Sequence, residues 1–145
     1  MKARTVLGAL VMMFVLVQTG NAGAKNGIQK YFNDTACKVK ATTDPIQKRE
    51  ILDKSLQTMS KALDKVQSLP LISKEDRAGI DRFKAALQEK QDELTGINGY
   101  ERVSDAQLND FSNYVVQDME QAERTVTISL VTLLLIVIIV ILIAR

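Results

Sequence analysis

Two pairs of acidic residues come closest to acid–base chemistry in type and spacing. Asp92 and Glu93 are adjacent, and Glu120 and Glu123 stand three residues apart. Paired carboxylates act as general acid and base when their environments separate their pKa values. Both pairs fall in stretches of helical periodicity, where neighbouring acids are typical of a solvated face. We therefore interpret them as surface charges and expect that the protein is not an enzyme.

The residues that most other catalytic sites require are missing from the sequence. The chain of 145 residues has no His, a single Cys and no Trp. A Ser-His-Asp triad, a Cys-His pair and a Cys/His zinc site are therefore excluded. The sequence also lacks the G-x-G-x-x-G, G-x-x-x-x-G-K-[ST] and D-x-[DN]-x-[DN]-G patterns of nucleotide and calcium sites. We expect no cofactor, no metal and no small-molecule substrate.

The single cysteine, Cys37, lies off the apolar face that Ile28, Phe32 and Val39 form at helical spacing. An exposed odd cysteine in an oxidising compartment is a candidate for a disulfide between two chains. The other interpretation, which we favour, is a partly buried and inert thiol. Asn33 begins an N-x-[ST] sequence, which matters only in a source that glycosylates exported proteins.

Charge is distributed unevenly along the chain. Residues 25–65 hold nine bases and five acids, whereas residues 100–123 hold six acids and one base. The interpretation we favour is that basic and acidic helices pack side by side and balance. The other is a basic surface for an anionic partner, formed by Lys38, Lys40, Lys48 and Arg49. Between residues 25 and 124, sixteen bases against seventeen acids give a net charge of −1, so nucleic acid is not an expected partner.

Residues 125–144 form an uncharged, strongly apolar stretch, TVTISLVTLLLIVIIVILIA. At about 1.5 Å per residue, a helix of this length matches the roughly 30 Å hydrocarbon core of a bilayer. We therefore predict a transmembrane helix over 125–144. It has no G-x-x-x-G and no charge, so it is expected to anchor the chain rather than to form a close-packed dimer or an ion path. Thr125, Thr127, Ser129 and Thr132, near its outer end, are expected to bond back to their own helix, and weak hydrogen bonds to another helix are the alternative.

Residues 1–24 have the features of a signal peptide. Lys2 and Arg4 precede an apolar run of thirteen residues, and Ala22-Gly23-Ala24 fits the A-x-A pattern of signal peptidase sites. Cleavage is predicted after Ala24, or alternatively after Ala22, and an uncleaved signal anchor is the competing interpretation. The two apolar segments together predict a single-pass protein with an extracytoplasmic domain and a cytoplasmic C-terminus. We favour a bacterial cytoplasmic membrane.

The region between the two apolar segments has helical periodicity throughout. We predict helices over about 26–42, 44–68 and 73–95, and a fourth from Ser104. Each boundary carries a capping signal, namely Asp44 with Pro45, Ser73, Gly96, and Ser104 with Gln107. The apolar faces expected to form the core are Ile28, Phe32, Ala36 and Val39; Leu52, Leu56, Met59, Leu63 and Val66; Ile80, Phe83, Leu87 and Leu94; and Leu108, Phe111, Val115, Met119 and Ala122.

These signals predict an all-α protein, with a small helical bundle of three to four helices outside the membrane. Residues 25–103 are expected to contain a central antiparallel hairpin, and residues 104–124 an amphipathic juxtamembrane helix. Because neither Gly nor Pro occurs between residues 104 and 145, this last helix is predicted to continue straight into the span. In our preferred arrangement the bundle closes within one chain. The alternative is that hairpins of two chains pair through a coiled coil of about two heptads.

Architecture alone does not determine function, and two classes of function fit this one. The class we favour is a non-enzymatic interaction or scaffold protein of the cell envelope, which binds the lipid bilayer through residues 125–144 and binds another protein or itself. The alternative is an envelope structural or stress-type protein that contacts anionic lipid or wall polymer through its basic N-terminal half.

Overall fold

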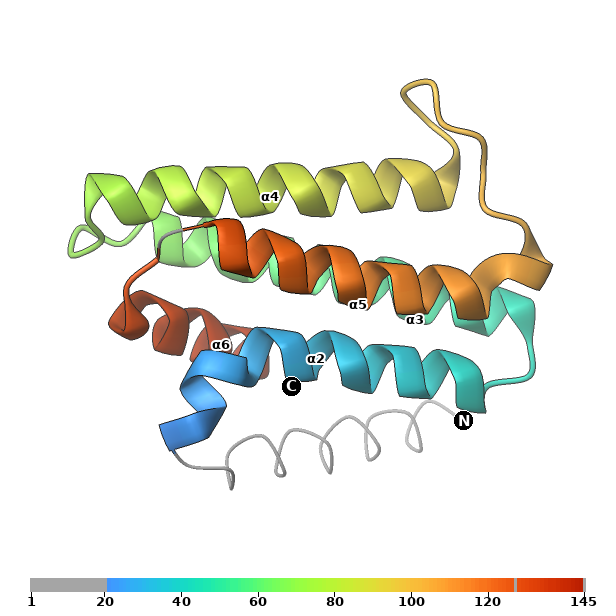
Figure 1. Ribbon diagram of the computed structural model, residues 1–145, viewed down its shortest axis with the longest axis horizontal. Coiled ribbons are helices and arrows are strands. Elements are labelled where there is room, and N and C mark those ends of the chain that lie inside the picture. Colours follow the sequence, from blue (N-terminus) through green and yellow to red (C-terminus); the bar gives the residue numbers. More distant parts are fainter. Residues whose placement is uncertain (1–20, 127, 145) are drawn as a thin grey trace.

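The computed structural model describes residues 21–126 and 128–144, with side chains given except at 21–26 and 125. Helices are the regular elements within these ranges, which confirms the all-α part of the predicted fold class. The elements, shown in Figure 1, are α2 (Asn21–Ala41), α3 (Pro45–Gln67), α4 (Lys74–Thr95), the 3-10 helix η1 (Asp105–Gln107), α5 (Leu108–Thr125) and α6 (Leu130–Ala144). Most of the predicted signal peptide, residues 1–20, lies outside the described residues.

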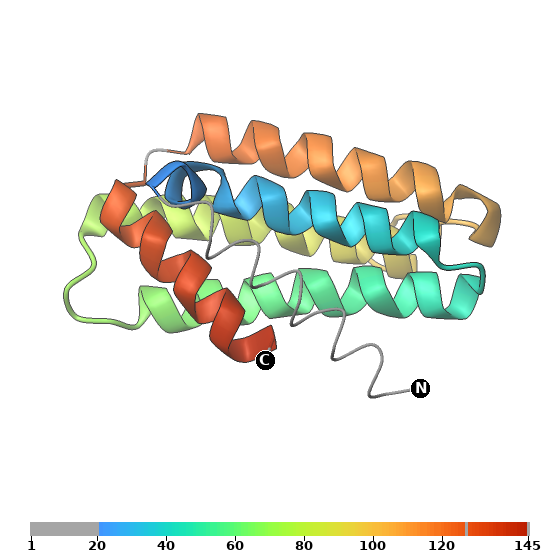
Figure 2. The ribbon, with the colours of Figure 1, turned by 90° about the horizontal axis from the view of Figure 1, so that it is seen from below.

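Helices α2 to α5 form an antiparallel bundle in which the chain runs back and forth along one long axis (Figure 1). Each helix packs on the next one in the chain, and α5 returns to contact α2, which closes the ring. The central hairpin of α3 and α4 is present, and the bundle closes within one chain. Helix α6 runs back from the end of α5 and lies across α2 and α3 (Figure 2).

The core consists of the apolar faces that the helical spacing predicts. Phe32, Leu63, Phe83 and Met119, one from each bundle helix, are at most 1% exposed. Of the predicted core residues, Ala122 alone is half-buried, and it packs against the core. Each of the four helices therefore uses its apolar face to cover the other three, which is the main source of stability for short amphipathic helices.

Three helix ends have the predicted capping geometry. The Asp44 carboxylate accepts a hydrogen bond from the Ile46 N–H at 3.0 Å, and the Ser73 hydroxyl accepts one from the Asp76 N–H at 3.1 Å. Gly96 ends α4 in the left-handed region with φ 74°. These local signals correctly predicted the bounds of α3 and α4 to within one residue.

The start of α5 differs from the predicted capping box. Ser104 makes no side-chain capping bond, and the helix begins at Leu108 after η1. The Gln107 N–H donates to the Ser104 carbonyl at 3.0 Å, and this three-residue spacing tightens the first turn into a 3-10 helix.

The prediction of one continuous helix from residue 104 into the apolar tail is wrong. Helix α5 ends at Thr125, Val126 is extended with φ −100° and ψ 127°, and α6 begins only at Leu130. The four β-branched residues 125–128 do not by themselves explain this break, because residues 136–141 are six β-branched residues in succession within α6. The turn lets one side of α6 pack on the bundle. Among the described residues, no helix has both the length and the apolar character that a membrane crossing requires.

Candidate functional site

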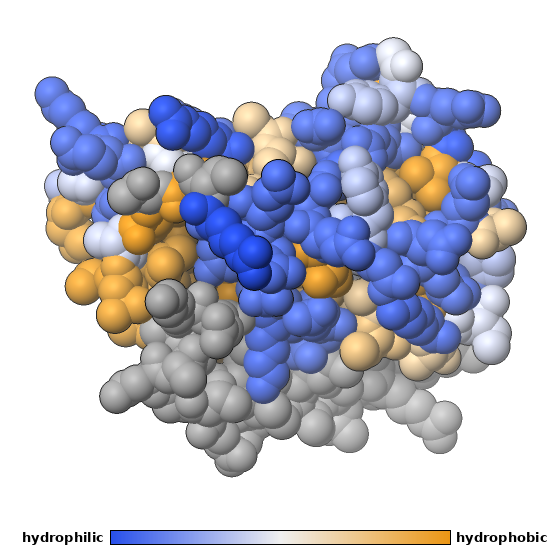
Figure 3. Space-filling view, in the orientation of Figure 1, coloured by the Kyte–Doolittle hydropathy of each residue, from blue (hydrophilic) through white to orange (hydrophobic). Residues whose placement is uncertain are grey.

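Helix α6 is apolar on every side, but it is buried on one side only. Thr132, Ile136 and Val140 face the bundle and are at most 4% exposed. The opposite side forms the outer stripe, in which five large apolar residues are between 43% and 65% exposed: Leu130, Val131, Leu134, Ile138 and Leu142. Hydrophobic surface accordingly gathers at the left end of the molecule, where α6 begins (Figure 3). This stripe is the least water-compatible surface among the described residues.

The α6-binding surface is formed by Gly27, Ile28 and Tyr31 of α2 with Met59 of α3, opposite Val137, Val140 and Ile141 of α6. At Gly27 the two helices approach closely. A Cβ atom at this position would lie 2.6 Å from Val137 Cγ2, which is closer than real carbon atoms approach. The absence of a side chain at Gly27 is therefore what lets α6 lie against α2.

A polar cluster of Asp76, Ser129 and Thr132 holds the beginning of α6. Asp76, in the first turn of α4, accepts hydrogen bonds from the Ser129 N–H at 3.0 Å, the Ser129 hydroxyl at 2.7 Å and the Thr132 hydroxyl at 2.6 Å. The Ser129 hydroxyl also lies 3.0 Å from that of Thr132. The expectation that these two hydroxyls bond mainly within their own helix is therefore wrong, because both donate to α4.

The Asp76 carboxyl has a lowered pKa, although it is buried. Burial alone would raise the pKa, but the bonds from Thr132, Ser129 and Ser73 together favour the ionised form more strongly. The first turn of a helix also favours a negative charge. We therefore assign a carboxylate to this position at neutral pH, where it attracts the donors of α6.

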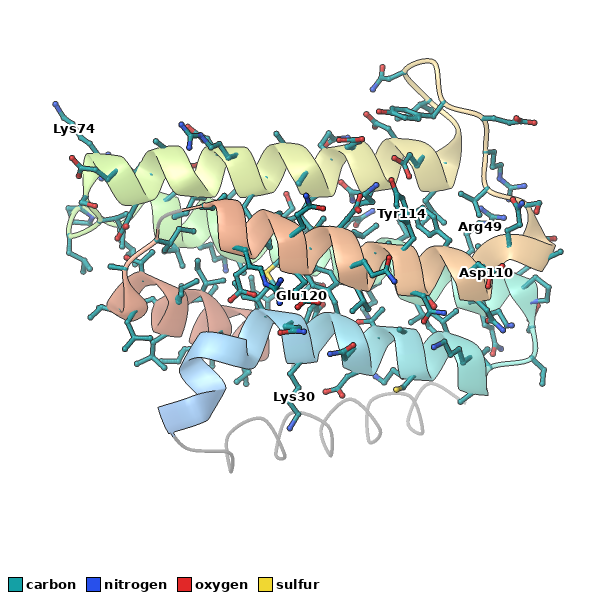
Figure 4. All side chains as sticks on the ribbon, viewed as in Figure 1. Lys30, Arg49, Lys74, Asp110, Tyr114 and Glu120 are labelled. Carbon is teal, nitrogen blue, oxygen red and sulfur yellow. The ribbon has the colours of Figure 1, made fainter. Side chains whose placement is uncertain are left out.

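A second buried polar cluster joins α4 to α5. The Lys90 ammonium, in a side chain 2% exposed, lies 2.5 Å from Asp118 Oδ2 and 3.0 Å from Glu93 Oε1. It also lies 3.8 Å from the centre of the Tyr114 ring, which Figure 4 labels. Burial lowers the pKa of Lys90, yet its bonds to Asp118, Tyr114 and Glu93 outweigh this effect and raise it. Lys90 thus stays protonated and links α4 to α5 through its ion pair with Asp118.

The two acidic pairs noted in the sequence are separated by their contacts. Glu93 binds Lys90, whereas Asp92 accepts from Gln88 at 2.9 Å and Asn98 at 3.0 Å, which fixes the turn after α4. At the other pair, Glu120 binds Arg124 at 2.6 Å. The pKa of Glu123 is raised by burial and by the neighbouring Glu120 charge. These contacts give three of the four acids a structural bond. The interpretation of both pairs as solvated surface charges is wrong, because Asp92 is buried and the other three acids are half-buried.

The four cations of the predicted basic surface do not form one free patch. Arg49 donates to the Leu94 carbonyl at 3.0 Å and the Val103 carbonyl at 2.7 Å, and pairs with Asp105 at 2.9 Å. It therefore fastens the segment between α4 and α5 to α3, at the right end of Figure 4.

The other three cations differ in exposure. Lys48 donates to Asn109 Oδ1 at 2.8 Å, and Lys40 is exposed. Lys38 is half-buried, and burial lowers its pKa more than the nearby Asp34 raises it. Two of the four predicted cations, Lys48 and Arg49, are thus engaged within the bundle.

Cys37 is a free, exposed thiol on α2. Its position off the core face is as predicted, whereas the interpretation that we favoured, a partly buried thiol, is wrong. Asn33 is exposed on the same helix. Among the described residues no group of three or more acids and thiols is arranged to hold a metal ion.

A shallow groove lies at the end of the bundle away from the start of α6. It is lined by side chains of both charges from the start of α3, the end of α4 and the segment that follows α4: Ile46, Arg49, Glu50, Asp53, Leu94, Thr95, Arg102 and Asp105. Ile46 lines the groove and is 69% exposed, while Ile97 and Tyr100, which are 50% and 40% exposed, belong to the segment that follows α4. This end therefore offers mixed charge and scattered apolar surface.

Comparison with known proteins gives no relationship: no family model, no curated protein and no solved structure matches this chain.

Proposed function

We propose that this protein is a non-enzymatic, single-pass membrane protein of the cell envelope, anchored by residues 125–144, whose helical bundle binds another protein or a second copy. The outer stripe of α6 carries this proposal. A helix that is apolar on all sides is normally either fully buried in protein or surrounded by lipid. Helix α6 has five large apolar side chains in contact with water, and lipid is the environment that would cover them.

The length of the segment supports an anchor only if α6 is extended towards α5. The fifteen residues of α6 reach about 22 Å, which is short of the roughly 30 Å hydrocarbon core. With residues 126–129 also helical, the uncharged segment of twenty residues, 125–144, reaches about 30 Å. The proposal therefore requires the turn between α5 and α6 to become helical in the membrane.

The proposed topology has the bundle on the extracytoplasmic side of a bacterial cytoplasmic membrane and the C-terminal end in the cytoplasm. Cleavage after Ala24 removes the first four residues of α2 but leaves Gly27 and Ile28, where the described contacts of α2 begin. The loss of the signal peptide is thus compatible with an intact bundle.

The exposed apolar residues around the shallow groove favour a protein partner for the bundle. The start of α3 and the end of α4, which line the groove, lie at the end of the bundle opposite the start of α6 (Figure 1), so a partner bound there leaves the membrane segment free. Contact with anionic lipid or wall polymer is less well supported, because Lys48 and Arg49 are engaged in contacts within the bundle.

The proposal is tested by extracting membranes of cells that express the full chain with alkaline carbonate. The variant Leu134→Asp/Ile138→Asp adds two charges to the outer stripe without touching the α6-binding surface. The matched control, Ala78→Asp/Ala85→Asp, adds the same charges to exposed positions of α4. We expect the native chain and the control to stay in the membrane and the stripe variant to be released. Equal retention of all three chains would refute the anchor.

A further inference from the structure

We propose that α6 is a releasable anchor, held on the bundle in one state of the protein and released from it to enter a bilayer in another. This inference rests on the proposed function. It follows from two observations taken together, of which a permanent anchor explains only the second. The bundle has a fitted surface for α6, and the same helix keeps an apolar side exposed to water.

The bound state is specified by matched contacts rather than by general hydrophobicity. Gly27 provides the space that Val137 occupies. Asp76 binds the Ser129 N–H, which at the start of a helix has no partner within that helix. The same carboxylate satisfies the hydroxyl of Thr132, which is buried. An apolar helix that lay on the bundle by chance would not have its polar groups paired in this way.

Release requires only a local change of backbone. Val126 is extended, while the Val126 N–H still donates to the Ala122 carbonyl at 3.1 Å, so the helical bonding of α5 continues to that residue. No Gly or Pro interrupts the chain from there to α6. Joining the two helices would require the backbone between Thr125 and Leu130 to become helical, and hinge segments commonly act through such local changes.

Water favours the bound state of α6, and a bilayer favours the released state. In water, the bound state covers Ile136 and Val140, and release would expose them together with the α6-binding surface. In a bilayer, the inner and outer sides of α6 are both covered, and the helical backbone satisfies its own hydrogen bonds. A lipid surface is therefore the ligand that shifts the equilibrium towards release, since it can cover both sides of α6 in the released state but only the outer stripe in the bound state.

The inference is tested by a disulfide that locks α6 to α2. A Cβ atom at position 27 would lie 3.5 Å from Val137 Cβ, within the 3.5–4.5 Å that disulfides require. The lock is the full-length chain with Gly27→Cys and Val137→Cys in a Cys37→Ser background. Control chains carry one of the two new cysteines each, so they cannot form the internal bond.

The purified lock is oxidised or reduced, mixed with phosphatidylcholine vesicles and digested with proteinase K. Mass spectrometry then measures the protected peptide from residues 126–144. We expect the reduced lock and both controls to give this peptide, and the oxidised lock to give at least tenfold less. Because the readout is a peptide from α6, it is independent of any membrane contact made by residues 1–24.

Each contrary result has a distinct meaning. Failure of the two cysteines to bond in vesicle-free protein would overturn the bound state. Equal protection in the oxidised and reduced lock would overturn release, but it would leave a membrane anchor intact. Absence of protection in every chain would overturn the proposed function itself.

A second variant tests release without new cysteines. Asp76→Ala removes the group that accepts the hydrogen bonds of α6, so α6 should insert into vesicles at least tenfold faster than in the native chain. Glu75→Ala is the matched control, because Glu75 is an exposed acid in the same first turn of α4. An Asp76→Ala rate equal to that of the native chain would also overturn the inference.

Discussion

Replacing Asp76 with Ala tests whether the polar cluster holds α6 on the bundle. The substitution removes the acceptor of three hydrogen bonds, of which two come from Ser129 and one from Thr132. These three donors belong to the start of α6, whereas the remaining partner, Ser73, precedes α4 itself, so most of the loss falls on the contact between α4 and α6. The bundle core does not include this side chain, and α2 to α5 should keep their structure.

The size of the loss in α6 binding depends on which donors can bond to water after Asp76→Ala. Hydrogen bonds to a charged group contribute about 1.5–3 kcal/mol each. Ser129 is exposed, so its two donors regain water, whereas the buried Thr132 hydroxyl keeps only its contact with Ser129. We therefore expect α6 binding to weaken by roughly 2–3 kcal/mol rather than by the full sum. At 1.4 kcal/mol per factor of ten, this raises the opening equilibrium of α6 roughly 30- to 150-fold.

Native-state hydrogen exchange in vesicle-free solution measures this opening directly. Amides of α6 should lose protection by that factor, while amides in the middle of α3 and α4 change little, because α6 can open separately from the bundle. Glu75→Ala removes a charge from the same helix end and controls for the helix dipole. A loss in α6 of less than about threefold, or an equal loss in the Glu75 variant, would refute the assigned role of Asp76.

Three further predictions concern stability in solution. Because the folded-state pKa of Asp76 lies below its ordinary value of 3.8, its contribution is complete above about pH 4 and is lost as the pH falls through the folded pKa. The difference in free energy of unfolding between the native chain and Asp76→Ala, measured with urea, should thus be larger at pH 6 than at pH 2.5. Lys90→Met leaves two carboxylates facing each other around a buried site, and urea unfolding should show a loss of about 2–4 kcal/mol. Gly96→Ala combines a positive φ with a Cβ 2.7 Å from a neighbouring backbone nitrogen, whereas Gly99→Ala has the positive φ with open space. In the same assay Gly96→Ala should lower the free energy of unfolding by at least about 3 kcal/mol and Gly99→Ala by about 1 kcal/mol. Equal losses in the two variants would contradict the steric argument.

The bundle could be predicted from the sequence because its signals are local. The spacing of apolar residues along each helix decides which side is buried, and Phe32, Leu63 and Phe83 are buried as their spacing indicates. Capping residues act on the backbone within a few positions, so Asp44 and Gly96 mark helix ends without knowledge of the fold.

The contacts of α6 could not be predicted because they join distant parts of the chain. Asp76 has the features of an ordinary first-turn acid, and nothing in its surroundings indicates Ser129, which is 53 residues away. The roles of Arg49 and Lys90 depend in the same way on which helices become neighbours. Gly27 gives no local signal either, since its effect depends on the position of Val137. The composition of residues 125–144 is as compatible with binding to protein as with insertion into lipid.

The position of α6 in the chain gives the contact between Gly27 and Val137 a kinetic consequence. Helices α3 and α4 pack on their neighbours in the chain, whereas α6 must find α2 after the four bundle helices have been synthesised. Contacts between residues far apart in sequence form slowly, because closing a long loop costs entropy. During that interval a nearby bilayer competes for the same apolar helix. The fraction of chains that enter the membrane would then depend on the relative rates of docking and insertion as well as on their equilibrium.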